Sequence, residues 1–202
     1  MEAALGRAGG LAGTGGRALL GITGMPGAGK STLAMALADA MGPRAVCVPM
    51  DGFHLANAEL VRLGRRQRKG APDTFDAAGY LALLRRLRLA EAGVVVYAPS
   101  FDRTIEEPVA GAIPVAPEVP LVLSEGNYLL MDGEWAPVGE QFHETWYVEA
   151  PEAIRVARLI ARHVSFGKSE DEARRWTLGS DQANARLIAA TADRADVLVR
   201  LD

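Results

Sequence analysis

The chain has little cysteine and little lysine. Among its 202 residues Cys47 is the single cysteine, so no disulfide can form within the chain. Cys47 lies in an apolar run, where a small buried side chain is the expected role, and the lack of disulfides favours the reducing cytoplasm. Lysine occurs only at positions 30, 69 and 168, while the other basic residues are arginines. Because lysine is so rare in this chain, these three positions are candidates for specific roles.

Strong net charge and long hydrophobic runs are also missing. The formal net charge is −3, so we expect neither nucleic acid nor an anionic membrane as a partner. No apolar run approaches the ~20 residues that span a bilayer. Residues 1–16 are rich in Gly and Ala without the pattern of a signal peptide, which predicts a flexible leader. Residues 17–202 have the length of a single α/β domain.

The most specific motif is GMPGAGKS at residues 24–31, which fits the phosphate-loop pattern G-x-x-x-x-G-K-[ST]. Its glycines allow backbone N–H groups to converge on phosphate oxygens. Lys30 is placed for the β- and γ-phosphates, and the Ser31 hydroxyl is placed for Mg²⁺. An apolar run precedes the motif and a helical segment follows it, so a helix N-terminus faces the anion. The sequence therefore predicts that the chain binds a nucleoside triphosphate.

Apolar runs that alternate with helical segments predict a three-layer α/β fold, with a parallel sheet of about five strands flanked by helices. The expected strands are residues 18–23, 45–50, 120–123, 145–148 and 195–201, with short additional strands at 94–97 and 113–115. The expected helices are residues 31–41, 76–91, 151–163 and 170–190. No repeat and no second domain is expected.

Two acidic residues follow predicted strands. Asp51 follows residues 45–50 and Glu125 follows residues 121–123. Ligands of open parallel sheets bind at the carboxyl ends of the strands, so both side chains are expected near the γ-phosphate. Asp51 suits a general base that orients an acceptor hydroxyl, and Glu125 suits a metal site together with Ser31. Alternatively, each carboxylate caps a helix or turn.

Arg155, Arg158 and Arg162 recur at helical spacing and lead into the break at residues 165–169. This pattern predicts a lid around residues 158–170, with Arg158 and Arg162 supplying charge to the transferred phosphoryl group. The alternative is a solvated helix face paired with Glu152.

A second basic cluster covers residues 62–69. It could hold an anionic acceptor, but for Arg62, Arg65 and Arg66 a solvated surface is the preferred interpretation. Lys69, which precedes Gly70 and Pro72, fits a substrate loop.

Several segments resemble one family. MDGFHLANAEL at 50–60, RKGAPDTFD at 68–76 and LSEGNYLL at 123–130, together with the phosphate loop, resemble the phosphoribulokinase/uridine kinase/pantothenate kinase family. The resemblance covers about residues 18–190 and is strongest for short bacterial members described as sugar kinases linked to fructose transport. The insertions of phosphoribulokinases and the length of pantothenate kinases are absent, so neither substrate is carried over.

This resemblance implies an assignment of site residues. Asp51 is implied as the catalytic base, to which the phosphate-loop motif adds Lys30 and the helical arginine pattern adds Arg158 and Arg162 as further catalytic groups. The nucleotide would contact Gly24, Met25, Pro26, Gly27, Ala28, Gly29, Lys30, Ser31 and Thr32. The acceptor would lie near Asp51, Phe53, His54, Arg68, Lys69, Asp73, Arg103, Glu125 and Tyr128. From the residues alone, Phe53 fits a core position equally well, and His54 fits a satisfied loop residue.

The favoured function is an ATP-dependent kinase that uses ATP and Mg²⁺ to phosphorylate a hydroxyl of a sugar or sugar-like metabolite. A uridine-type nucleoside kinase or a pantothenate-type kinase is the alternative within this class. A GTPase switch is disfavoured because no N-K-x-D segment is present, and a transport ATPase because L-S-G-G-Q is absent. The expected partner is a small-molecule hydroxyl acceptor, and a homodimer is left open.

Overall fold

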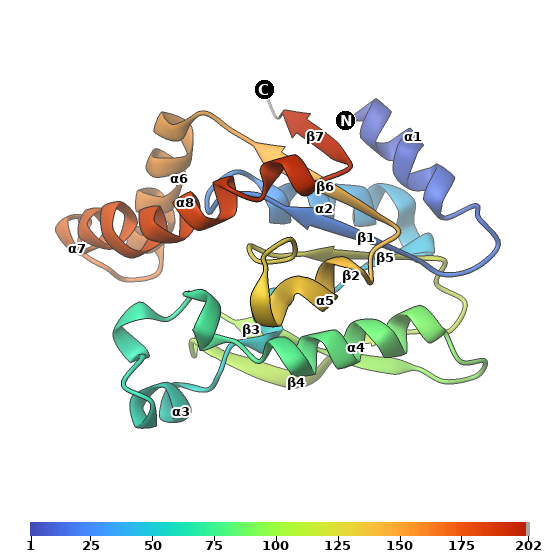
Figure 1. Ribbon diagram of the computed structural model, residues 1–202, viewed down its shortest axis with the longest axis horizontal. Helices are drawn as coiled ribbons and strands as arrows, with labels where there is room; N and C mark the ends of the chain where they lie inside the picture. The colour runs from blue at the N-terminus through green and yellow to red at the C-terminus, as the bar shows by residue number, and fades with distance from the viewer. Residues whose placement is uncertain (201–202) are drawn as a thin grey trace.

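The computed structural model describes residues 1–200, and its centre is a five-stranded parallel sheet (Figure 1). The order across the sheet is β2 (Ala45–Cys47), β5 (Leu121–Glu125), β1 (Ala18–Thr23), β6 (Glu144–Glu149) and β7 (Val197–Arg200). All four neighbouring pairs are parallel, with Ala18 opposite Leu121 and Leu20 opposite Glu144. The predicted α/β fold is therefore confirmed.

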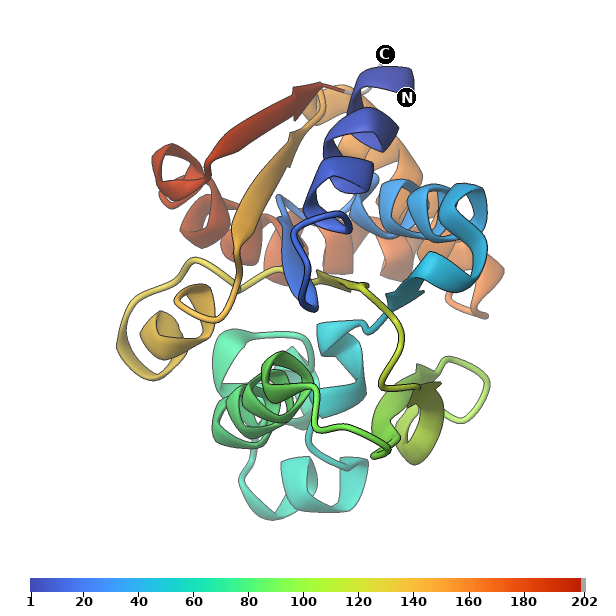
Figure 2. The ribbon, with the colours of Figure 1, turned by 90° about the vertical axis from the view of Figure 1, so that its right-hand side faces the viewer.

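Helices cover both faces of this sheet (Figure 2). Because side chains alternate along a strand, Leu19 faces one core while Leu20 and Ile22 face the other. The second core lies under α1 (Glu2–Leu11) and α2 (Lys30–Met41). The first core packs against α4 (Ala77–Leu89), α5 (Ala136–Gly139) and α8 (Gln182–Ala189). Burial on both faces explains why no polar side chain occurs in β1 before its last residue, Thr23.

The N-terminal segment differs from the prediction of a flexible leader over residues 1–16, which is wrong for most of its length. Residues 2–11 form helix α1, in which Ala8 is completely buried. The Arg7 guanidinium also donates to Glu144 at 2.6 Å. Gly and Ala residues have no large apolar side chains to signal a packed helix, yet small residues allow this helix to lie close against its neighbours.

A separate antiparallel hairpin, β3 (Val96–Asp102) and β4 (Glu107–Val115), lies outside the main sheet (Figure 2). The sequence predicts only short strands at residues 94–97 and 113–115. Val96, Ala98 and Val115 anchor the hairpin in the core below α4. Its turn therefore projects from a fixed base.

The remaining elements are short, apart from the 14-residue helix α6 (Glu152–Ser165). Beta-strand β2 is shorter than predicted, because residues 50–53 form a helical turn. The segment predicted as one helix over residues 170–190 contains α7, a π-helical turn and α8. The other helices are α3 (Asn57–Arg62), α6 (Glu152–Ser165) and α7 (Glu170–Trp176), with the π-helical turn Thr177–Asp181. Short 3₁₀ turns are Gly42–Arg44, Met50–Phe53, Arg66–Arg68, Pro72–Thr74, Gly133–Trp135 and Ala192–Arg194. Within residues 1–200, no helix combines the length and apolar character needed to cross a membrane.

Candidate active site

The phosphate loop joins β1 to α2, as its sequence predicts. Gly27 has a φ of +80°, and a Cβ at this position would lie 2.7 Å from the Arg155 carbonyl oxygen. A glycine is therefore required both by the backbone conformation and by the close approach of α6. Lys30 is buried at the start of α2, where its Nζ donates to the Met25 carbonyl at 3.3 Å.

Arg155, on α6 (Glu152–Ser165), contacts the phosphate loop through a buried hydrogen bond. Its side chain is 1% exposed, with Nη1 donating to the Pro26 carbonyl at 3.0 Å and Nη2 to Gln182 Oε1 at 3.1 Å. Arg155 thus belongs to the support of the phosphate loop, although its helical spacing groups it with the arginines of the predicted lid. Arg158, one turn later, is exposed and lines the outer pocket beside the phosphate loop.

Glu125 is the last residue of β5, and Asp51 lies in the 3₁₀ turn that follows the neighbouring strand β2. Gly126 permits this arrangement, because an added Cβ there would lie 2.5 Å from Met50 Cβ. A buried Ser124 hydroxyl further joins the two strand ends by donating to the Val48 carbonyl at 2.5 Å. The Ser31 hydroxyl donates to Glu125 Oε1 at 2.8 Å. The structure therefore brings the phosphate loop and both predicted carboxylates together.

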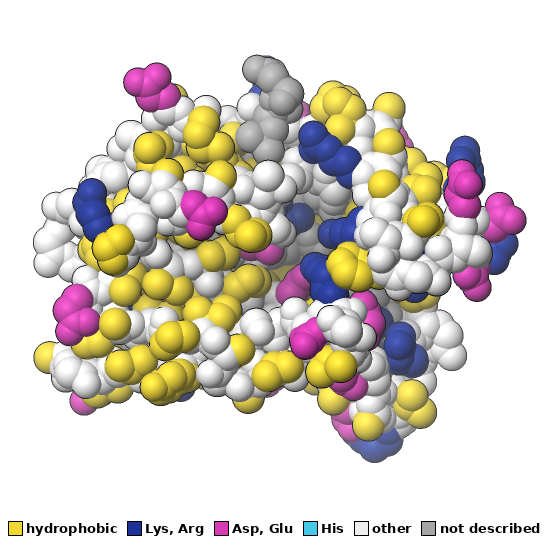
Figure 3. Space-filling view, turned by 180° about the vertical axis from the view of Figure 1, so that it is seen from behind, with side chains coloured by type: hydrophobic (Ala, Val, Ile, Leu, Met, Phe, Trp, Pro, Cys, Tyr) yellow, Lys and Arg dark blue, Asp and Glu magenta, His cyan; other side chains and the backbone are white. Residues whose placement is uncertain are grey.

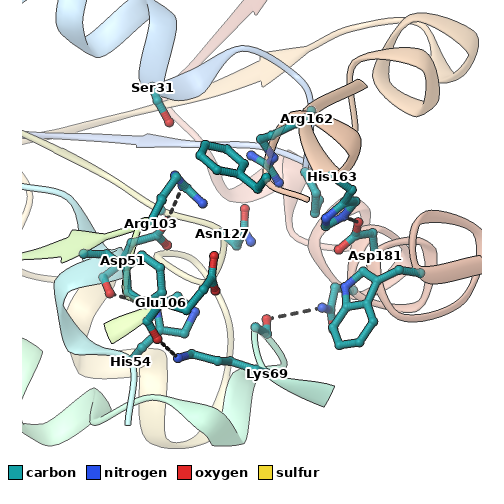
Figure 4. Close-up of a pocket in the computed structure, with 18 of the residues that line it drawn as sticks. Ser31, Asp51, His54, Lys69, Arg103, Glu106, Asn127, Arg162, His163 and Asp181 are labelled. Carbon is teal, nitrogen blue, oxygen red and sulfur yellow. Dashed lines mark hydrogen bonds and ion pairs between the residues drawn. The ribbon is translucent and has the colours of Figure 1, made fainter. Parts of the chain in front are cut away.

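These residues open into a cavity of about 260 Å³, seen as a hollow containing basic and acidic side chains in Figure 3. Its walls come from the phosphate loop, the 3₁₀ turn at residues 50–53, the loop around Lys69, the β3–β4 turn and the end of α6 (Figure 4). An adjoining outer pocket is lined by Gly27, Gly29, Lys30, Ser31, Thr32, Arg103, Arg158, Leu159, Arg162 and Phe166. The two hollows share Lys30 and Ser31, so the phosphate loop lies between them.

Two side chains, His54 and Arg103, are fixed beside Asp51 by hydrogen bonds to this residue. His54 Nδ1 donates to the Asp51 carbonyl at 2.8 Å, and the imidazole packs against Phe75 and Phe101 at centroid distances of 4.0 and 4.7 Å. Burial lowers the pKa of His54, so its ring is neutral at pH 7 and Nε2 is a hydrogen-bond acceptor. Arg103 Nη2 donates to Asp51 Oδ2 at 3.2 Å.

Charged groups converge around the phosphate loop. Burial lowers the pKa of Lys30 to about 8, although the Glu125 and Asp51 carboxylates oppose this shift. Burial raises the pKa of Glu125, and the Asp51 charge raises it further. Burial also lowers the pKa of Arg162, with repulsion from Arg103 acting in the same direction. Both arginines thus flank a space whose electrostatics favour a bound anion.

The residues present also fit Mg²⁺, which prefers oxygen ligands and is usually held by one or two carboxylates, waters and substrate phosphates. Ser31 Oγ and Glu125 Oε1 are 2.8 Å apart beside the phosphate loop, and both line the cavity. No group of three or more His, Cys, Asp or Glu side chains suited to a metal occurs in residues 1–200. A metal here would therefore depend on phosphate oxygens for part of its coordination.

Five of the residues predicted to contact the acceptor line the cavity, and four do not. Asp51, His54, Lys69, Arg103 and Glu125 line it. Phe53 instead packs on Tyr80 at 5.2 Å, and Tyr128 is buried with its hydroxyl donating to the Gly70 carbonyl. Arg68 and Asp73 form an ion pair with each other. These four residues shape the surrounding segments because their side chains are already satisfied by packing or pairing.

Sequence reasoning missed much of the cavity wall. Arg66 lines the cavity although a solvated surface position is the sequence-based expectation. Other lining residues that were not predicted are Gly70, Phe75, Phe101, Glu106, Gly126, Asn127, His163, Phe166, Lys168, Trp176, Asp181 and Asn184. His163 Nε2 and Asp181 Oδ2 are 2.8 Å apart, and Asn184 Nδ2 donates to the Gly70 carbonyl at 3.2 Å. The lysine positions were one usable signal, since all three lysines line the cavity.

Relatives that match most of the chain identify the family to which it belongs. No family model matches the chain. The chain is 33% identical over 196 residues to "Putative uridine kinase C227.14" of Schizosaccharomyces pombe, covering 91% of this chain and 83% of that protein. It is 34% identical over 182 residues to "Uncharacterized protein YggC" of Escherichia coli, covering 87% and 74%.

A solved structure agrees with these relatives. The "putative fructose transport system kinase" from Silicibacter sp. TM1040 is 38% identical, with 97% of this chain and 98% of that chain covered and a TM-score of 0.85. With its phosphate loop, its two strand-end carboxylates and these relatives, the chain belongs to the P-loop kinases of the phosphoribulokinase/uridine kinase/pantothenate kinase family, which are ATP-dependent.

Proposed function

We propose that this kinase transfers the γ-phosphoryl group of ATP to a hydroxyl of a small sugar-like acceptor. The observation that carries the proposal is the position of Asp51. Its carboxylate lines the same cavity as Lys30 and Ser31, on the wall opposite the basic end of α6. A carboxylate beside the phosphate loop suits a base for an incoming hydroxyl, because phosphoryl transfer needs positioning and charge stabilisation above all.

The reaction follows from the groups in the cavity. The acceptor oxygen bonds to the γ-phosphorus while the bond from this phosphorus to the β–γ bridging oxygen breaks, releasing ADP. The acceptor proton passes to Asp51. Lys30 and Arg162 line both hollows, where they can stabilise charge on the transferred group. Mg²⁺, held by Ser31 and Glu125, would neutralise phosphate charge when bound.

The lid remains part of this proposal. Arg158 and Arg162 lie on α6, whose last residue is followed by a four-residue turn that leads into α7. Phe166 of this turn lines both hollows. Closure of the segment around residues 158–170 would bring the two arginines toward the triphosphate and exclude water from the transfer.

An ADP-release assay over sugars, polyols, nucleosides and pantothenate tests the proposal. With the best acceptor, Asp51→Asn is expected to lower kcat by about 10²–10⁴-fold, the usual contribution of a general base, with little change in ATP binding by calorimetry. Asp39→Asn, an exposed site on α2, is the matched control. Equal turnover by Asp51→Asn would exclude this base, and ADP release independent of every acceptor would favour an ATPase or switch.

A further inference from the structure

One end of the cavity carries basic groups that the phosphate loop does not use. Six Lys or Arg residues line the cavity. Lys30, Arg103 and Arg162 also line the outer pocket beside the phosphate loop, where a triphosphate accounts for them. Arg66, Lys69 and Lys168 line the cavity but not this outer pocket. Their charges therefore face the space left for the acceptor.

Arg66 differs from the other arginines of its own segment. Arg62 pairs with Glu59 at 2.6 Å, and Arg65 lies 3.4 Å from Asp73. Arg68 also pairs with Asp73. Within residues 1–200, Arg66 has neither an ion pair nor a side-chain hydrogen bond, and it is only partly exposed. The pairing of its neighbours leaves one guanidinium for a ligand in the cavity.

Lys168 reaches the same cavity from the turn between α6 and α7. Its Nζ lies 5.0 Å from the centroid of the Trp176 ring, and no carboxylate in the described part of the chain lies within ion-pair distance. Glu172, in the first turn of α7, is engaged by the Ser169 hydroxyl and N–H at 2.7 and 3.0 Å. Gln67 and Lys168 line a common neighbouring pocket. The 3₁₀ turn Arg66–Arg68, which contains Gln67, therefore faces the turn at residues 166–169, which contains Lys168.

Lys69 has a structural task but forms no ion pair in the described part of the chain. Its Nζ donates to Asn57 Oδ1 at 2.7 Å and to the Glu106 carbonyl, which are both neutral acceptors. Burial lowers the pKa of Lys69, the Glu107 and Glu106 carboxylates oppose this shift, and repulsion from the Arg66 guanidinium acts in the same direction as burial. Repulsion between neighbouring cations is relieved when an anion binds between them.

Glu106 contributes a carboxylate to the wall of the same cavity. Its backbone has a φ of +55°, which is uncommon for a residue other than glycine, and its carbonyl is held by Lys69 and by Asn57 Nδ2 at 3.1 Å. This conformation directs its carboxylate into the cavity (Figure 4). Asp51, Glu125 and Asp181 each have a side-chain partner, whereas none is found for the Glu106 carboxylate in the described residues. A carboxylate in this state suits the hydroxyl groups of a ligand.

We propose that the acceptor is a polyhydroxylated anion, whose carboxylate or phosphate group binds Arg66 and Lys168 while one of its hydroxyls binds Glu106. This inference rests on the proposed phosphoryl transfer, because it assigns a second hydroxyl of the same molecule to Asp51. It also explains why basic groups lie on both sides of the reacting centre.

Matched probes test this proposal. Each polyol from three to six carbons would be compared with its aldonic acid and with its phosphate monoester in the ADP-release assay. We expect one of the two anionic series to be preferred by kcat/KM, and the preferred series identifies the anionic group. Arg66→Ala and Lys168→Ala should each raise the KM for that acceptor by about 10–100-fold, the range for charge-assisted hydrogen bonds. Arg66→Lys should recover part of the loss, and kcat and the KM for ATP should change little.

Arg62→Ala, in the same segment but paired with Glu59 outside the cavity, is the control and should behave like the unmodified protein. Preference for neutral polyols would overturn the proposal, as would an Arg66→Ala variant that raises the KM for ATP instead of the acceptor.

A binding measurement separates this inference from the proposed activity. The protein saturated with a non-hydrolysable ATP analogue and Mg²⁺ would be titrated with the same acids and phosphates by calorimetry. Binding that Arg66→Ala weakens supports the anion site even if no acceptor releases ADP, in which case only the phosphoryl-transfer proposal fails. Absence of binding by every acid and phosphate overturns the anion site.

Discussion

The Arg103 guanidinium donates to the Asp51 carboxylate at 3.2 Å, although the two residues belong to segments that meet only in the folded chain. Arg103 also lies 5.8 Å from the Phe101 ring and 5.7 Å from the Phe166 ring. One guanidinium thus contacts the proposed base, the β3–β4 hairpin and the turn that ends α6. Such an arrangement fixes the orientation of the Asp51 carboxylate before the acceptor binds.

Replacement of Arg103 is expected to affect the chemical step. Arg103→Ala should lower kcat by about 10–100-fold, because a hydrogen bond to a charged group contributes ~1.5–3 kcal/mol. Arg103→Lys should recover little of it, since an ammonium cannot replace a planar group between two rings. Steady-state kinetics with the best acceptor measures both variants, with the exposed Arg85→Ala on α4 as control. Unchanged kcat in Arg103→Ala would show that Asp51 needs no such partner.

Nucleotide binding should be accompanied by proton uptake near pH 8. Burial holds the pKa of Lys30 at about 8 in the free protein, and a neighbouring triphosphate would raise it. The affinity for ATP should therefore change little through this group below pH 8 and fall as the pH rises above it. Calorimetry in buffers of different ionisation enthalpy measures the protons taken up. Uptake that is equal at pH 6.5 and pH 8 would contradict the assignment to Lys30.

The requirement for Mg²⁺ should become steeper in acid. Burial and the Asp51 charge raise the pKa of Glu125, and the protonated carboxyl is a poor metal ligand. The Mg²⁺ concentration for half-maximal activity should therefore rise as the pH falls through this raised pKa. Glu125→Gln should remove this pH dependence and lower the activity at every pH. Glu118→Gln, at an exposed site, should leave both unchanged. A Mg²⁺ requirement that does not vary with pH in the unmodified protein would exclude Glu125 as ligand.

Replacement of Arg155 should lower the stability of the protein, whereas replacement of Arg158 should affect the KM for ATP. Arg155→Ala removes a buried side chain and leaves the Pro26 carbonyl and Gln182 without their donor, so the free energy of unfolding should fall by about 2–4 kcal/mol. Arg158→Ala, on the exposed face of the same helix, should change it by less than ~0.5 kcal/mol while raising the KM for ATP. Urea denaturation and steady-state kinetics provide the two readouts. The reverse pattern would show that Arg158, and not Arg155, supports the loop.

The parts of the site that the sequence predicts are those fixed by regular structure. Asp51 and Glu125 were identifiable because the carboxyl ends of parallel strands meet at one edge of a sheet. Arg66 was not identifiable, because the pairing of its neighbours with Glu59 and Asp73, which leaves Arg66 without an ion pair within residues 1–200, is seen only in the folded chain. Likewise, a helical repeat places Arg155 near Arg158 but does not indicate which of them meets the Pro26 carbonyl.

The β3–β4 hairpin was difficult to predict for a related reason. Its prolines and polar residues weaken the strand pattern, and its stability comes from Val96, Ala98 and Val115 packing against a core formed by distant segments. Helix α1 was missed because a segment of small residues gives a weak periodic signal, whereas its burial is decided by contact with the sheet and α2.

The β3–β4 hairpin is separate from the parallel sheet, and this has a consequence for how the choice of acceptor could be changed. Within residues 1–200 its strands pair only with each other, Val96, Ala98 and Val115 anchor its base, and its turn carries Arg103 and Glu106 into the cavity. Substitutions at residues 104–106 are thus expected to alter the choice of acceptor while the parallel sheet keeps its packing, whereas substitution of Arg103 would also remove the hydrogen bond to Asp51. The turn thus links the choice of acceptor to the orientation of the proposed base, and an exchange of residues 104–106 that keeps Arg103 is the way to change the first without the second.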